Sequence, residues 1–349
     1  MLTRMTISVV IPTRNRAVSL HRLLGALSQQ DRKPEEVIVV DASDTPSDEM
    51  ALGPAYPVLR IACLRAAPSV CGQRNAGIRR AIGSHVLLCD DDVEPPPDYI
   101  GKLIAHLERD PTTGAVTGMV ADAGSAGQPV FELRAPSFRY LLFASVFQLG
   151  VFGDVEATRG SWFTSIPLAA LKKWYRRRGN TWSLAGWPLV TQVRTPVVRT
   201  AAYGLGAALI RRDWLLASPY DERLSAHGIG DNYGVALKFP GDRSIAVLTD
   251  LSVRHHNASE NRLDAATTYY QRLLALDYFM RADHRFSAVN RVFLVWSLLG
   301  RAGMFAISRR RDLFSASVHA IALIGTGRNP LCSGLQISPS GVSHARTPR

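Results

Sequence analysis

The sequence has few cysteines and no long uncharged apolar run. Only 4 of its 349 residues are cysteines, and none form a C-x-x-C pair, which argues against a zinc site or a disulfide framework and favours buried free thiols in a reducing cytosol. No segment reaches the roughly 18 to 20 uncharged apolar residues of a membrane-spanning helix. Residues 1–5 also lack the apolar region of a secretion signal. We therefore expect a cytoplasmic protein, and peripheral attachment to the inner face of the cell membrane stays an open alternative.

Acidic residues are outnumbered by basic ones, which gives a formal net charge of +12. A charge of this sign favours a polyanionic partner, which could be nucleic acid, an anionic membrane surface or a phosphorylated substrate. No zinc finger and no aromatic RNA-binding signature is present. We therefore expect no nucleic acid partner, and the other two classes remain.

The first third of the chain alternates between apolar segments of strand length and helical patterns. The strand-like segments are 7–11, 36–40, 58–64 and the run that begins at Val86. A turn that leads into a helix is predicted at 72–77, between Gly72 and Gly77. Nearly continuous apolar strands that alternate with helices indicate a parallel sheet covered on both faces. The predicted fold class is therefore α/β, with a Rossmann-like, mostly parallel sheet flanked by helices.

Polar side chains fall at or just beyond the carboxyl ends of these strands. They are Thr13 and Arg14, Asp41, Arg74 and Asn75, and Asp90 to Asp92. Ligands of open α/β sheets collect at this edge, so we expect four segments distant in sequence to deliver polar groups to one site. Taken singly, each has a simpler explanation: Asp41 could cap a turn, and Arg74 could be a surface arginine.

Asp90, Asp91 and Asp92 are three adjacent carboxylates directly after an apolar run. Neighbouring like charges raise one another's pKa, so such groups are either spread out in solvent or held together by a cation. Oxygen ligands of this hardness suit Mg²⁺ or Mn²⁺ rather than zinc. The alternative is a solvated acidic turn.

These segments resemble the family 2 glycosyltransferases of the GT-A fold. The resemblance covers residues 5–120 and rests on four motifs: a first-strand signature at 10–16, a second strand at 39–43, an R-N-x-G turn at 74–77 and a D-x-D at 90–92. It implies a catalytic domain that binds a nucleotide-diphosphate sugar.

The resemblance also implies a role for each matching residue. Asp41 and Arg74 would hold the nucleotide base, whereas Asp90 and Asp91 would lie near the ribose and the diphosphate. Asp92 would bind a divalent metal, Mg²⁺ or Mn²⁺, directly. The remaining predicted members of the nucleotide-sugar site are Thr13, Arg14 and Asn75.

The resemblance weakens over 121–195 and returns at 202–212 and 220–224. The family normally has a Glu-Asp pair at the start of the next helix, and this sequence has Gly230 and Asp231 there. Asp231 would be the catalytic base by this resemblance. The alternative is an acid that is favoured at a helix N-terminus by the helix dipole.

A histidine pair, His255 and His256, follows an apolar strand. It lies where the family often supplies a histidine to the metal or the diphosphate. His255 fits that position slightly better than His256. A structural histidine is the alternative.

The predicted organisation has three parts. Residues 1–260 form the GT-A catalytic domain, in which 121–195 is a variable insertion on the acceptor side or a cap. Residues 261–325 form an apolar helical region with arginine and tryptophan at its edges, which either lies in a membrane interface or packs on the catalytic domain as an amphipathic helix pair. The glycine-, serine- and proline-rich tail 326–349 is predicted to be disordered.

The resemblance thus predicts a metal-dependent, inverting glycosyltransferase that moves one sugar to a hydroxyl group of a saccharide or lipid-linked acceptor. The Q-x-x-R-W signature of processive members is absent, which favours a single transfer per visit. A sugar-phosphate nucleotidyltransferase would need a glycine-rich phosphate loop after the first strand, and residues 12–16 contain no glycine. A non-catalytic protein that binds sugar nucleotides, or a scaffold, is suggested by Gly230.

Overall fold

The chain forms two compact units. Unit 1 contains residues 1–134, 193–222 and 226–262, and unit 2 contains residues 135–192, 223–225 and 263–349. The computed structural model describes residues 5–47, 49–123, 129–131, 134–241, 244–257 and 260–333. The two units are therefore interleaved in sequence.

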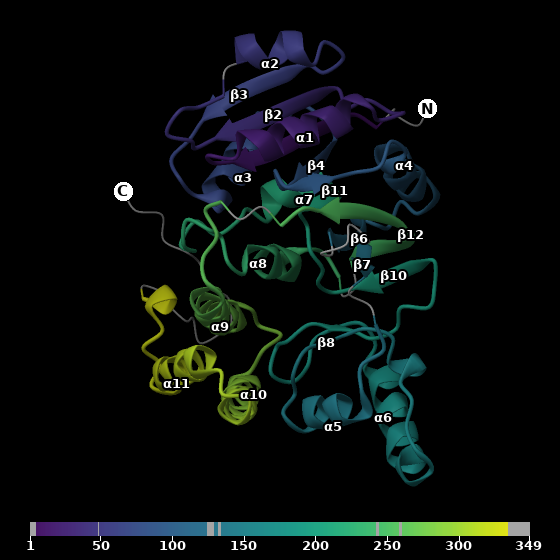
Figure 1. Ribbon diagram of the computed structural model, residues 1–349, viewed down its shortest axis with the longest axis vertical. Helices are drawn as coiled ribbons and strands as arrows, with labels where there is room; N and C mark the ends of the chain where they lie inside the picture. Colours follow the sequence, from purple (N-terminus) through teal and green to yellow (C-terminus); the bar gives the residue numbers. More distant parts are fainter. Residues whose placement is uncertain are drawn as a thin grey trace. The chain divides into compact units, whose positions relative to one another are not determined.

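Unit 1 is built on one mixed sheet with the strand order β10-β12-β6-β11-β4-β1-β2-β3 (Figure 1). The strands are β1 Ile7–Thr13, β2 Glu36–Asp41, β3 Ile61–Arg65, β4 His85–Cys89, β5 Val93–Glu94, β6 Ala115–Ala123, β7 Pro129–Phe131, β10 Val197–Thr200, β11 Ala207–Arg211 and β12 Ile245–His255. The four strands β3, β2, β1 and β4 are parallel neighbours, and β11 runs antiparallel to both β4 and β6. The predicted α/β class is confirmed, and the antiparallel strand β11 comes from the second half of the unit.

Helices cover both faces of this sheet. They are α1 Ala17–Ser28, α2 Glu49–Ala55, α3 Val70–Arg80, α4 Tyr99–Arg109, α7 Arg212–Ala217 and α8 Asp231–Lys238. Alternate residues of a strand point to opposite faces, so Val9 packs in the same core as α1 and α4, whereas Val10 faces Gly77 of α3. The leucines of α1 are buried because they recur at helical spacing on the face that meets the sheet.

Residues 72–77, which the sequence predicts to be a turn, lie inside α3. Ser69 caps the helix by accepting a hydrogen bond from the backbone N–H of Gly72 at 3.1 Å. Gly77 serves close packing rather than a turn, because a Cβ there would lie 2.4 Å from Cγ1 of Val10. Arg74 and Asn75 therefore lie on a helix and are buried.

Unit 2 is mainly helical. Its elements are α5 Phe138–Val146, β8 Val151–Phe152, η1 Val155–Ala157, η2 Trp162–Thr164, α6 Ser165–Arg178, β9 Leu189–Val190, α9 Ala265–Ala282, α10 Ala288–Ile307, α11 Arg311–Gly325 and η3 Pro330–Cys332. A small core that includes Leu141, Tyr175 and Leu189 joins α5, α6 and β9. Within the described ranges, none of the helices combines the length and the apolar character needed to cross a bilayer.

The two units divide the chain differently from the predicted organisation. Residues 135–192, predicted to be an insertion in the catalytic domain, group with the C-terminal helices. The beginning of the predicted tail has defined structure, because Asn329 donates from Nδ2 to Oδ2 of Asp277 at 2.8 Å and to the carbonyl of Leu274 at 2.9 Å. The rest of that tail, 334–349, lies outside the described residues.

We expect Gly77→Ala to lower the free energy of unfolding by about 1–3 kcal/mol, because the added methyl group must push α3 away from β1. Gly25→Ala in α1 is the matched control. Nothing lies within 4 Å of a Cβ at Gly25, so this change should be neutral or stabilise by up to about 1 kcal/mol. Denaturant unfolding followed by circular dichroism measures both, and equal stabilities of the two variants would contradict this packing.

Candidate active site

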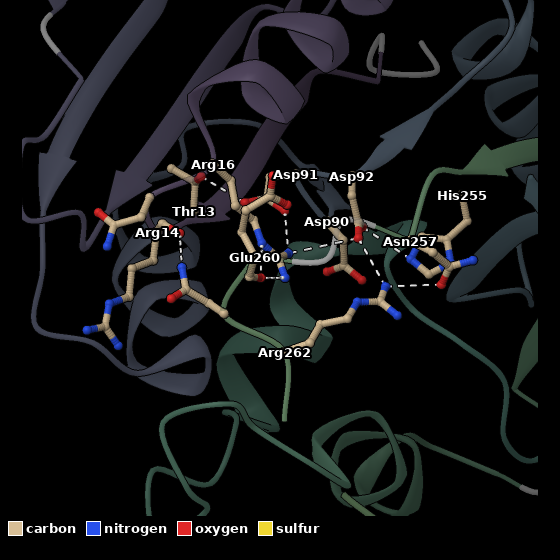
Figure 2. Close-up of polar contacts among 12 residues, drawn as sticks. Thr13, Arg14, Arg16, Asp90, Asp91, Asp92, His255, Asn257, Glu260 and Arg262 are labelled. Atoms are coloured by element: carbon tan, nitrogen blue, oxygen red, sulfur yellow. Dashed lines mark hydrogen bonds and ion pairs between the residues drawn. The ribbon is translucent and has the colours of Figure 1, made fainter. Parts of the chain in front are cut away.

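The loop between β4 and β5 brings three aspartates next to the end of β1. Asp91 accepts a hydrogen bond at Oδ2 from Thr13 Oγ1 at 2.8 Å, and its Oδ1 lies 3.0 Å from Nη1 of Arg16 (Figure 2). Because β1 and β4 are parallel neighbours, their carboxyl ends meet at this edge. Burial, opposed by Arg16 and by the hydrogen bond from Thr13, raises the pKa of Asp91 to about 6.

Asp92 is buried beside one histidine and two arginines. Its Oδ1 lies 3.2 Å from Nε2 of His255, at the end of β12, and its Oδ2 lies 3.5 Å from Nη2 of Arg262 (Figure 2). Arg16 approaches the same oxygen at 3.9 Å. His256 instead pairs with Glu94 at 2.6 Å, so this geometry favours His255 as the histidine of the site.

Arg74 connects two carboxylates that come from different elements. Its side chain donates from Nη2 to Asp90 in the β4–β5 loop and from Nη1 to Asp231 in α8. The guanidinium also lies 5.1 Å from the ring centroid of Tyr220. Arg74 is only 4% exposed, so its charge is balanced inside the protein rather than by water.

Asp231 is the first residue of α8 and is buried. Its Oδ1 accepts a hydrogen bond from the backbone N–H of Asn232 at 2.6 Å, as expected for an acid at a helix N-terminus. Burial, with a smaller contribution from Asp90, raises the pKa of Asp231, and Arg74 opposes this shift. Gly230 has a φ of 97°, a conformation that a glutamate rarely adopts, so a glutamate at this position would strain the turn that precedes α8.

Two other predicted residues bond elsewhere through their side chains, and the side chain of a third points away from the aspartates. Asp41 accepts hydrogen bonds from the backbone N–H groups of Ser43 and Ser47, both at 2.7 Å, and so caps its own loop. Asn75 donates to the carbonyl of Tyr220 at 2.9 Å. The Arg14 side chain points away from the aspartates in Figure 2.

The structure therefore brings part of the predicted set together through direct contacts. These residues are Thr13, Arg74, Asp90, Asp91, Asp92, Asp231 and His255. Among the described residues, no hydrogen bond or ion pair joins the side chains of Arg14, Asp41 or Asn75 to these aspartates. The assigned roles of all ten residues stay predictions.

The sequence analysis missed two arginines and a glycine of this site. Arg16 stands in the first-strand motif beside Thr13, and that position was the available signal. Arg262 carries no such signal, because only the fold brings it near Asp92. A Cβ at Gly206 would lie 2.2 Å from Oδ2 of Asp90, so this glycine leaves room for the carboxylate.

Asp92 offers a carboxylate that suits a divalent cation. No group of three or more histidine, cysteine or acidic side chains is positioned to hold a metal within the described part of the chain. Magnesium usually takes one or two carboxylates and completes its shell with substrate phosphates and water, and carboxylate oxygens suit manganese as well. The chemistry of Asp92 therefore fits either ion if phosphate oxygens supply most of the remaining ligands, and His255 would be an additional nitrogen ligand.

Comparison with known proteins gives matches over the first part of the chain. Residues 8–154 match the model of glycosyl transferase family 2. The uncharacterized glycosyltransferase YwdF of Bacillus subtilis (strain 168) is 38% identical over 105 residues, which are 30% of this chain and 39% of YwdF. The match thus spans well under half of that relative.

Solved structures are similar over most of the chain at low sequence identity. GalNAc-T7, crystallised with UDP, GalNAc and Mn²⁺, aligns with 95% of this chain and 59% of its own at 15% identity and a TM-score of 0.55. The mannosyltransferase PcManGT from Pyrobaculum calidifontis, in complex with GDP-Man and Mn²⁺, aligns with 94% of this chain and 88% of its own at 14% identity and a TM-score of 0.53. These similarities concern the fold alone. Residues 8–154 are therefore similar to glycosyl transferase family 2, and the fold is that of these solved glycosyltransferases, as the motifs predicted.

Proposed function

We propose that the protein is a metal-dependent, inverting glycosyltransferase that moves one sugar from a nucleotide-diphosphate sugar to a hydroxyl group of a saccharide or lipid-linked acceptor. One observation carries this proposal: Asp90 and Asp231 both accept hydrogen bonds from the buried guanidinium of Arg74. The proposed base and an acid predicted for the donor side thus share one arginine, which supports a single site. Similar structures hold UDP or GDP-Man together with Mn²⁺, which supports the donor class.

On the proposed donor side, arginine side chains neutralise the aspartates of the β4–β5 loop. Arg16 contacts Asp91 and Asp92, and Arg262 contacts Asp92, so both guanidinium groups lie where a diphosphate would compete for them. In the proposed complex Asp92 and His255 would hold Mg²⁺ or Mn²⁺. When bound, this ion offsets the charge of the departing nucleoside diphosphate.

Asp231 acts on the acceptor side as the general base. It takes the proton of the acceptor hydroxyl while that oxygen bonds to the anomeric carbon and the bond to the diphosphate breaks, which inverts the configuration. Each oxygen of Asp231 already accepts one hydrogen bond, from Arg74 or from Asn232, and keeps a second lone pair for the hydroxyl. The pKa raised by burial makes this carboxylate a stronger base than an exposed aspartate.

A non-catalytic sugar-nucleotide-binding or scaffold protein is the second candidate. It is favoured by Gly230, which replaces the usual glutamate, and by the ion pair that occupies Asp231. Both candidates would bind nucleotide sugars, but only the enzyme would release free nucleoside diphosphate. A thermal-shift screen of UDP-, GDP- and dTDP-sugars with and without Mn²⁺ selects the donor for the assays below.

Asp231→Asn should lower turnover by about 10²- to 10⁴-fold, the usual contribution of a general base. Donor affinity, measured by calorimetry, should change little, because asparagine keeps the shape of the side chain. Release of nucleoside diphosphate reports turnover, and Asp250→Asn, at an exposed acid of unit 1, is the control. Turnover near that of the unmodified protein would show that Asp231 is not the base.

Asp92→Asn should weaken nucleoside diphosphate binding by at least about tenfold in the presence of Mn²⁺, because a metal ligand is lost. Without Mn²⁺ the affinity should be nearly unchanged. Calorimetry with UDP or GDP, as the screen directs, measures both values. The control is Asp98→Asn, a half-exposed acid that pairs with Lys102. Equal metal dependence in the Asp92 and Asp98 variants would rule out a metal at Asp92.

A further inference from the structure

Helix α10 exposes a continuous apolar stripe. The residues of this stripe are Val289, Val292, Trp296, Leu299 and Ile307. They share one side of the helix, because the first four recur every three or four residues and Ile307 follows about two turns later. Val292 is 69% exposed, Leu299 49% and Ile307 87%. The opposite side packs inward through Leu294, Leu298 and Ala302. A water-facing helix side would be polar if it contacted only solvent.

A second helix widens the stripe. The Trp296 indole donates from Nε1 to the carbonyl of Val146 in α5 at 2.9 Å, and its ring stacks on Phe147 with centroids 4.9 Å apart. Val146 and Leu142, one helical turn apart in α5, are both exposed. We call these side chains of α5 and α10 the apolar face of unit 2.

A cationic groove lies where α10 meets α11. Its volume is about 340 Å³, and it is lined by Phe305, Ala306, Arg309, Arg311 and Phe314. Arg310 pairs with Asp312 at 3.6 Å. Among the described residues, Arg309 and Arg311 have no acidic partner. The groove is thus lined by these two arginines and by two phenylalanines.

We propose that the apolar face and the groove dock on a bilayer that contains anionic phospholipids, with a phosphate headgroup in the groove. Side chains such as Trp296 suit the boundary between acyl chains and headgroups, and arginines suit the level of the phosphates. Docking of this kind places the helices on the membrane surface and needs no spanning segment.

The charges of these helices favour an anionic bilayer over a second copy of the chain as the partner of this face. Helices α5 and α10 contain no acidic residue, and the one acid of α11, Asp312, already pairs with Arg310. Two copies meeting through this face would supply no carboxylate for Arg309 and Arg311, whereas an anionic leaflet supplies phosphates. The inference concerns unit 2 and does not depend on the proposed catalytic activity.

The test is co-sedimentation of the full chain with vesicles of phosphatidylcholine alone or with about one third phosphatidylglycerol. We expect binding to the anionic vesicles that weakens as salt rises, and little binding to phosphatidylcholine. The triple variant Val292→Ser, Leu299→Ser and Ile307→Ser should lose about tenfold or more of this binding. The matched control is Val18→Ser, Val58→Ser and Ile82→Ser, three similarly exposed sites in unit 1, which should bind as the unmodified protein does.

A second pair of variants distinguishes the contribution of the groove to vesicle binding from that of net charge. Arg309→Gln with Arg311→Gln should weaken binding several-fold more than Arg22→Gln with Arg79→Gln, which removes the same charge from exposed sites of unit 1. Equal losses in the two pairs would overturn the groove assignment. The docking proposal fails if no anionic vesicle is bound. It also fails if sedimentation velocity shows a dimer that only the stripe variant abolishes, because the apolar face would then be a contact between copies.

Discussion

The buried guanidinium of Arg74 is the interaction on which the site depends. A buried charge is costly unless it is paired and hydrogen-bonded, and Arg74 meets this requirement with Asp90 on one side and Asp231 on the other. The ring of Tyr220 contacts the same cation. Because the three partners come from the β4–β5 loop, α8 and the segment before it, folding of unit 1 holds these parts together as one polar cluster.

The same principle extends along the β4–β5 loop. Asp91 is compensated by Arg16 and Asp92 by Arg262, and His255 also contacts Asp92. Acids that would repel one another are thus held close together by arginines, which would also meet the diphosphate in the proposed complex. Arg16 further donates from Nε and Nη2 to the carbonyl of Glu260, which ties the end of β1 to the segment after β12. The free protein therefore already contains both the carboxylates that a metal ion would need and the arginines that the phosphates of a nucleotide would need.

Local sequence patterns correctly predicted the parallel half of the sheet. The alternation of apolar strands and helices predicted β1 to β4 and the acids that follow β4. It failed at α3, where Gly72 and Gly77 suggested a turn, because the Ser69 cap and the contact with Val10 are visible only in three dimensions. The contact between Arg262 and Asp92 could not be predicted from the sequence either, because no local pattern links these two residues. The antiparallel strand β11 and the grouping of 135–192 with the C-terminal helices depend on long-range packing.

The most direct test of the account is a double-mutant cycle between Arg74→Met and Asp231→Asn, measured as free energies of unfolding in denaturant. Arg74→Met leaves the buried carboxylate of Asp231 without its cation, and Asp231→Asn leaves Arg74 with Asp90 alone. The double change removes both charges of the Arg74–Asp231 pair. The account predicts that the double variant is more stable than the sum of the single effects by about 1–3 kcal/mol, as for residues of one network. Additive effects, within about 0.5 kcal/mol, would contradict it.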